Sequence, residues 1–90
     1  MLEKEFYVIT FESTHLAIST EKFLLAEVAV EMVPTPREIS ASCGLSLKIS
    51  IENIEKVKSL LEERSKEGLN LYHLVREDGK KIPTQCSWEV

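Results

Sequence analysis

The sequence has little positive charge, and it has no long apolar run. Eleven lysines and arginines face fifteen acidic residues, which gives a net charge of −4. A protein that binds nucleic acid mainly through phosphate contacts needs a basic face, so this balance argues against nucleic acid as a partner. No apolar stretch approaches the roughly 18 residues that a membrane-spanning helix requires, so we expect no membrane association.

Cysteine is also scarce, with two residues in the chain. Because the N-terminus shows no signal-peptide pattern, we expect a cytoplasmic protein with free thiols rather than a structural disulfide. Cys43, Cys86, His15 and His73 lack the close paired spacing of a zinc site, so neither a metal nor another cofactor is expected. The sequence also lacks a Ser-His-Asp set, a paired-carboxylate signature and a phosphate-binding glycine loop. A carrier or accessory protein is therefore favoured over a stand-alone enzyme.

Ninety residues are enough for one domain and one core. We expect residues 1–90 to form a single domain, with a core at about 6–76 and a C-terminal tail at 77–90. The first apolar segment, residues 6–11, is apolar at nearly every position and predicts a central strand buried on both faces. Ser13 or Thr14 can then cap a helix over about 14–27.

The rest of the chain continues to switch between strand patterns and helix patterns. Residues 29–33 predict a strand that Pro34 and Pro36 end, and residues 45–50 alternate as a half-exposed strand. Ser50 can cap a second helix, with Gly68 as its C-cap. Residues 71–75 predict a strand and 77–79 a turn, and the tail is expected to add at most a short edge segment anchored by Trp88.

This order is β-α-β-β-α-β, which predicts an α+β, ferredoxin-like fold. Such a fold has a four-stranded antiparallel sheet with both helices on one face. Because unrelated activities occur on this fold, function has to be argued from a site.

The connection at residues 34–44 is longer than the two to five residues that most hairpins use. We call it the cysteine loop. Thr35-Pro36-Arg37-Glu38 fits a capping box, which predicts a short helical turn over about 36–42. Gly44 fits a left-handed residue at the end of this turn. Cys43 would then lie at the end of a stiffened loop.

Cys43 is the candidate reactive thiol, since a sulfur nucleophile must be reachable and must ionise. Arg37 would stabilise negative charge, Ser40 and Ser42 could donate hydrogen bonds, and the Gly44 amide could approach the sulfur. The dipole of a helix that ends at Cys43 would oppose a thiolate. In the alternative interpretation, Cys43 is a small buried apolar residue at the start of a strand.

Four other residues have both a structural and a functional interpretation. His15 could be a base or hydrogen-bond partner of Cys43, although an ordinary polar first-turn residue is favoured. His73 is expected at a solvent-facing strand position. Cys86 could resolve an oxidised Cys43, although an incidental tail thiol is favoured. Trp88 could cover a sheet edge or a dimer interface.

Two segments, YVITFESTHLA and VPTPREISASCGLSLKI, together with the helical second half, carry a family resemblance. The chain resembles the small sulfur/selenium-carrier-like family over residues 6–75, most specifically at residues 34–45. The resemblance implies that Cys43 corresponds to the family's central cysteine. Cys86 lies outside the residues that the resemblance covers. Because some members occur with TusA-type sulfur carriers, it also implies that sulfur-transfer proteins, such as a TusA-type carrier or a cysteine desulfurase, are the partners.

We therefore expect a sulfur or selenium carrier in which Cys43 accepts sulfane sulfur as a persulfide and passes it to a partner. The alternative is a non-catalytic module whose cysteine loop docks a protein or a small anion, with Cys43 structural. A homodimer is compatible with either function.

Overall fold

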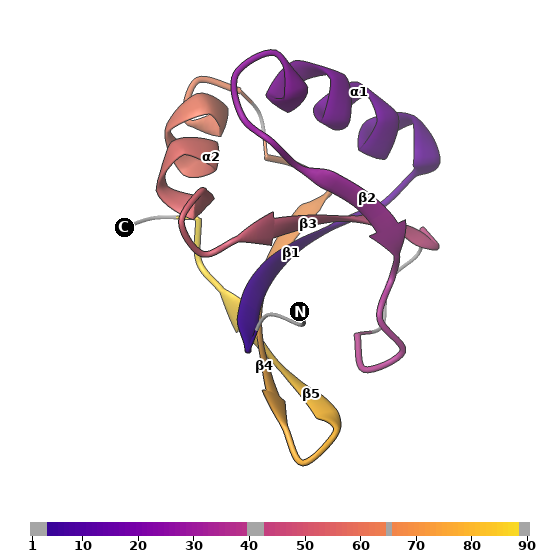
Figure 1. The fold of residues 1–90 in the computed structure, drawn as a ribbon. Helices are drawn as coiled ribbons and strands as arrows, with labels where there is room; N and C mark the ends of the chain where they lie inside the picture. The colour runs from indigo at the N-terminus through magenta and orange to yellow at the C-terminus, as the bar shows by residue number, and fades with distance from the viewer. Residues whose placement is uncertain (1–3, 40–42, 65, 89–90) are drawn as a thin grey trace.

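The computed structural model describes residues 4–39, 43–64 and 66–88. It is an α+β fold in which two helices lie over the same side of a five-stranded sheet (Figure 1). In chain order the elements are β1 (Glu5–Phe11), α1 (Thr14–Leu25), β2 (Glu31–Pro34), β3 (Leu45–Ser50), α2 (Ile54–Leu61), β4 (Leu69–Glu77) and β5 (Lys80–Cys86).

The strands lie in the order β2-β3-β1-β4-β5, and every neighbouring pair is antiparallel. The first six elements keep the expected β-α-β-β-α-β order, but the expectation of four strands is wrong. Asp78 and Gly79 have φ values of 50° and 76°, which suit a two-residue hairpin turn whose twist matches that of the strands. This turn lets the tail pair with β4 as a full fifth strand.

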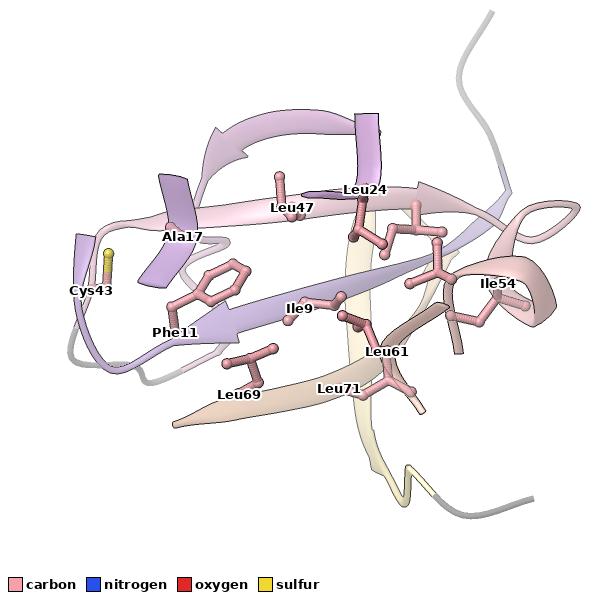
Figure 2. Packing of buried hydrophobic residues seen from close by; sticks show 12 residues of the cluster. Ile9, Phe11, Ala17, Leu24, Cys43, Leu47, Ile54, Leu61, Leu69 and Leu71 are labelled. Carbon is pink, nitrogen blue, oxygen red and sulfur yellow. The ribbon is translucent and has the colours of Figure 1, made fainter. Parts of the chain in front are cut away.

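The central strand β1 is buried on both faces, as its composition predicts. Ile9 and Phe11 face the helices in the larger core cluster (Figure 2). That cluster also contains Ala17 and Leu24 of α1, Ile54, Val57 and Leu61 of α2, and Leu47, Ile49, Leu69 and Leu71 of the neighbouring strands. Burying each of these large side chains contributes roughly 1.5–3 kcal/mol, so this face supplies most of the apolar driving force.

Neither α1 nor α2 lies over the opposite face of the sheet. Phe6 and Val8 of β1 cluster there with Leu74 of β4 and with Ile39 of the cysteine loop. Ile39 is only 6% exposed although it lies outside any strand or helix. The cysteine loop therefore folds back so that one of its side chains covers part of the second face.

Helix α1 begins as predicted, because the Ser13 side chain accepts a hydrogen bond from the Leu16 amide. Helix α2 begins differently. It starts at Ile54 after Asn53, whose side chain makes no capping hydrogen bond. The Ser50 carbonyl instead accepts from the Asn53 amide at 2.9 Å, so a turn separates Ser50 from the helix and the expected Ser50 cap is wrong.

Two strands have different ends from those predicted. Strand β2 begins at Glu31 and includes Pro34, which pairs with Leu45. An edge strand tolerates proline, because one side of its backbone has no strand partner. Strand β4 is longer than expected, and Trp88 anchors the chain beyond β5 by donating from its indole nitrogen to the Leu69 carbonyl at 3.2 Å.

The two loop glycines do not have the predicted roles. Gly68 has a φ of +82°, yet it precedes β4 and does not directly follow α2, which ends at Leu61. Gly44 does not have a positive φ, and its carbonyl accepts a hydrogen bond from the Thr35 amide at 2.8 Å. Strand pairing thus continues to Gly44, and the described part of the loop contains a turn but no helix.

We predict that Gly68→Ala and Gly44→Ala have different effects on stability. Gly68→Ala should lower the free energy of unfolding by about 1 kcal/mol, because an L-residue is strained at positive φ. Gly44→Ala is the matched control and should change it by less than about 0.5 kcal/mol, since no atom lies within 4 Å of the added Cβ. Urea denaturation measures both, and equal effects would contradict the assigned backbone geometry.

Candidate functional site

The position of Cys43 follows from the pairing of β1 with β3. Thr10 pairs with Ser46, so the end of β1 lies beside the start of β3. Helix α1 starts at Thr14, soon after β1 ends at Phe11. Cys43 precedes β3 and therefore lies at the N-terminal end of α1, where Figure 2 places it near Ala17.

Among the described residues, two groups lie within hydrogen-bonding distance of the Cys43 sulfur. The Leu45 amide donates to Sγ at 3.3 Å, and Thr14 Oγ1 lies 3.6 Å from it. Thr14 is also the first residue of α1, and a helix N-terminus carries partial positive charge. The opposing dipole depended on a helix that ends at Cys43. Residues 36–39 contain a turn and no helix, residues 40–42 lie outside the described residues, and the helix end beside the sulfur is the N-terminus of α1.

Thr35 ties the two ends of the cysteine loop together. Its hydroxyl donates to the Cys43 carbonyl at 3.0 Å and lies 2.7 Å from the Ser46 hydroxyl. Because a hydroxyl has one proton, Ser46 must donate to Thr35. Ser46 is fully buried in this contact and is not on an exposed strand face as predicted. Thr35 therefore positions Cys43 and does not cap a helix with Glu38.

Burial closes the thiol off from solvent. Cys43 is 5% exposed and belongs to the core cluster that contains Phe11 and Ala17. A buried thiol cannot meet a large electrophile unless the chain around it moves. The Cys43 sulfur therefore has hydrogen-bonding neighbours but little contact with solvent.

The other predicted site residues lie at varied places. Arg37 is exposed in the turn that the bond from the Ile39 amide to the Pro36 carbonyl closes at 3.0 Å. His15 is exposed on the first turn of α1. Gly44 directly follows Cys43, but the amide that donates a hydrogen bond to the Cys43 sulfur is that of Leu45. Ser40 and Ser42 lie outside the described residues.

Sequence reasoning missed the roles of Thr14, Thr35 and Ile39. The predicted strand order contained one usable signal, since it places the end of the first strand near the start of the third. That signal led to His15, whereas the side chain that reaches the sulfur is Thr14, one residue earlier. Thr35 was interpreted only from local spacing, and the capping-box pattern gave no sign of its bond to Ser46.

A second polar cluster lies on the helix side of the sheet. His73 Nε2 lies 3.2 Å from Glu5 Oε2, and its ring stacks on Tyr7 with centroids 4.8 Å apart. Burial raises the pKa of Tyr7, and the negative charges of Cys86, Glu5 and Glu55 raise it further. His73 is thus partly buried and paired, and the expectation of a solvent-facing histidine is wrong.

The two cysteines cannot form a disulfide with each other in this fold. Cys86 pairs with Leu71, Leu71 with Ile9, and Ile9 with Leu47. Three strand spacings thus place Cys86 about 14 Å from Leu47, and Cys43 lies further away, before the start of β3. A disulfide needs Cα atoms about 4.4–6.8 Å apart, and both cysteines are free.

Within residues 4–39, 43–64 and 66–88, no group of three His, Cys, Asp or Glu side chains is arranged to hold a metal ion. Neither helix in this part of the chain is long and apolar enough to cross a membrane.

Of three comparisons with known proteins, the one with family models gives a match. Searches of curated proteins and of solved structures found none. A family model described as "Putative Se/S carrier protein-like" matches residues 6–82. This range includes the whole cysteine loop, both helices, β1 from Phe6 onward, and all of β2, β3 and β4. The chain therefore belongs to the "Putative Se/S carrier protein-like" family.

Proposed function

We propose that this protein carries sulfur or selenium, and that Cys43 is the accepting residue. Family membership supports the carrier role. The position of Cys43 supports the choice of residue, because the thiol lies at the positive end of α1 and accepts a hydrogen bond from the Leu45 amide. These two groups can stabilise negative charge on the sulfur. Cys86 contacts the Thr84 carbonyl, which as an acceptor offers no such stabilisation.

The transfer step needs no external oxidant. The Cys43 thiolate attacks the terminal sulfur of a persulfide on a donor protein such as a cysteine desulfurase. A new sulfur–sulfur bond forms as the donor's bond breaks, and the electron pair leaves with the donor cysteine as a thiolate. Cys43 then holds a persulfide. Attack by an acceptor thiolate, for example on a TusA-type carrier, moves the terminal sulfur onward and regenerates the Cys43 thiolate.

Burial of Cys43 requires the cysteine loop to open before either step. Ile39 holds the loop against Phe6, Val8 and Leu74 on one face, and Thr35 ties it to Ser46 at its base. Local opening costs less free energy than global unfolding when few contacts have to break. We infer that opening displaces Ile39 while Thr35 keeps the base of the loop in place.

The surrounding residues then have defined roles in the proposal. Arg37, already exposed, faces the solvent from which a donor approaches and stabilises the incoming negative charge. His15 lies exposed on the same first turn as Thr14 and is available to exchange a proton. Ser40 and Ser42, which lie outside the described residues, and the Gly44 amide are proposed to shape the pocket around the thiolate. Two free thiols also suit a reducing cytoplasm, which is the compartment we propose.

A second candidate function is a docking module in which Cys43 is structural. The specific observation in its favour is that Cys43 is 5% exposed within an apolar cluster. In that case the cysteine loop binds a partner protein without thiol chemistry, and alanine at position 43 leaves function intact. The reactivity of Cys43 distinguishes the two functions.

We predict that Ile39→Ala exposes the thiol. In a Cys86→Ser background, alkylation of Cys43 by iodoacetamide should become at least tenfold faster. A buried Ile→Ala change costs roughly 2–5 kcal/mol, and every 1.4 kcal/mol or so lost from the closed state raises the open fraction tenfold. Ile51→Ala is the matched control, since Ile51 is 45% exposed. Equal alkylation rates in the two variants, at equal global stability by denaturation, would contradict loop opening at Ile39.

We predict that Cys43 alone accepts sulfur. After incubation with a cysteine desulfurase and free cysteine, intact mass spectrometry should show one added sulfur on wild type and on Cys86→Ser, and none on Cys43→Ser. Loading of Cys43→Ser at the wild-type level would refute the assignment. Polysulfide, which needs no protein donor, is the control: if it also fails to load wild type, the docking-module function is favoured.

We predict that Arg37→Ala slows this loading about fivefold, the effect of losing roughly 1 kcal/mol of exposed charge interaction. Arg64→Ala is the matched control, because Arg64 lies over the Phe23 ring of α1, with its guanidinium carbon 4.4 Å from the ring centroid. Loading rates are measured by quenching the transfer reaction at intervals and determining the mass of the intact protein by mass spectrometry. If both variants load at the same rate, Arg37 has no part in transfer.

A further inference from the structure

The second face of the sheet holds a pocket next to the part that Ile39 covers. Its volume is about 320 Å³, near the lower end of the range for small-molecule sites. It lies between the start of the cysteine loop and the β4–β5 hairpin, which both extend from the sheet on the side away from the helices (Figure 1). The lining residues are Phe6, Glu31, Val33, Pro34, Thr35, Pro36, Lys48, Arg76 and Lys81.

Three of these lining residues are cations, and two of them lie over one aromatic ring. The Lys48 ammonium lies 4.9 Å from the centroid of the Phe6 ring, and the Arg76 guanidinium carbon lies 5.1 Å from the same point. Because both distances are measured to the same centroid, the charges of Lys48 and Arg76 lie within about 10 Å of each other. Glu31 is the one carboxylate in the lining, so the pocket is positive on a chain whose net charge is −4.

The third cation lies beside Arg76, because Lys81 of β5 pairs directly with Arg76 of β4. Because Lys48 and Arg76 already lie over the Phe6 ring, the ring is not open for stacking with an aromatic ligand, and an oxyanion fits the pocket better.

We propose that this pocket binds a small phosphate-class oxyanion, either free or as part of a small molecule. Lys48, Arg76 and Lys81 would contact the anion, and Pro34 and Pro36 would form an apolar wall on the side of the cysteine loop. This site is separate from the thiol, since Cys43 packs in the cluster on the helix side of the sheet. The proposal does not depend on sulfur transfer.

Titration calorimetry with inorganic phosphate and with pyrophosphate, in a low-salt buffer free of other oxyanions, tests the proposal. We expect saturable one-to-one binding that weakens as salt is added. Lys81→Gln should bind about fivefold more weakly, whereas Lys56→Gln, the matched control on the exposed face of α2, should bind like wild type. Absence of saturable binding, or equal weakening in both variants, would overturn the site.

A variant that is expected to bind the anion more tightly separates an effect on binding from an effect on folding. Glu31 is exposed, so Glu31→Gln should fold normally and bind the anion more tightly than wild type, because it removes the pocket's carboxylate. Unchanged or weaker binding would count against the proposal. A Glu-rich peptide serves as competitor, and binding of that peptide without any binding of phosphate would overturn the small-anion site in favour of protein docking. Cys43→Ser should bind phosphate like wild type, which separates this test from that of the carrier function.

Discussion

A sheet whose central strand is apolar on both faces needs cover on both faces, and the two helices supply it on only one. Phe6 and Val8 would face water on the other side without further protection. Ile39 provides part of that cover from within the cysteine loop. The long connection between β2 and β3 thus has a structural role, because Ile39 within it covers part of the second face.

The same loop decides the environment of the thiol. Thr35 bonds the two ends of the loop together through the Cys43 carbonyl and the Ser46 hydroxyl, so Cys43 is held where β3 begins. The antiparallel pairing of β1 with β3 then brings the N-terminus of α1 to that point. Burial of the sulfur and its charge-stabilising neighbours thus come from one arrangement.

The part of the second face that Ile39 leaves uncovered carries the basic pocket. The β4–β5 hairpin forms one side of it, because Arg76 and Lys81 come from paired positions on these strands. The cysteine loop forms the other side through residues 34–36. The thiol and the pocket therefore lie on opposite faces of the sheet, and one segment of chain contributes to both.

Local patterns in the sequence were enough to predict the six alternating elements, the buried central strand, the Ser13 cap and the turn at residues 77–79, because each depends on neighbours in the chain. Local patterns failed where a distant partner decides the structure. Lys80–Cys86 became a strand because β4 offered an open edge, and Thr35 became an anchor because Ser46 lies opposite it. Cysteine position and family resemblance singled out Cys43 from the sequence alone. That it is buried, and that it lies at the start of α1, was decided by strand register, which residue spacing does not encode.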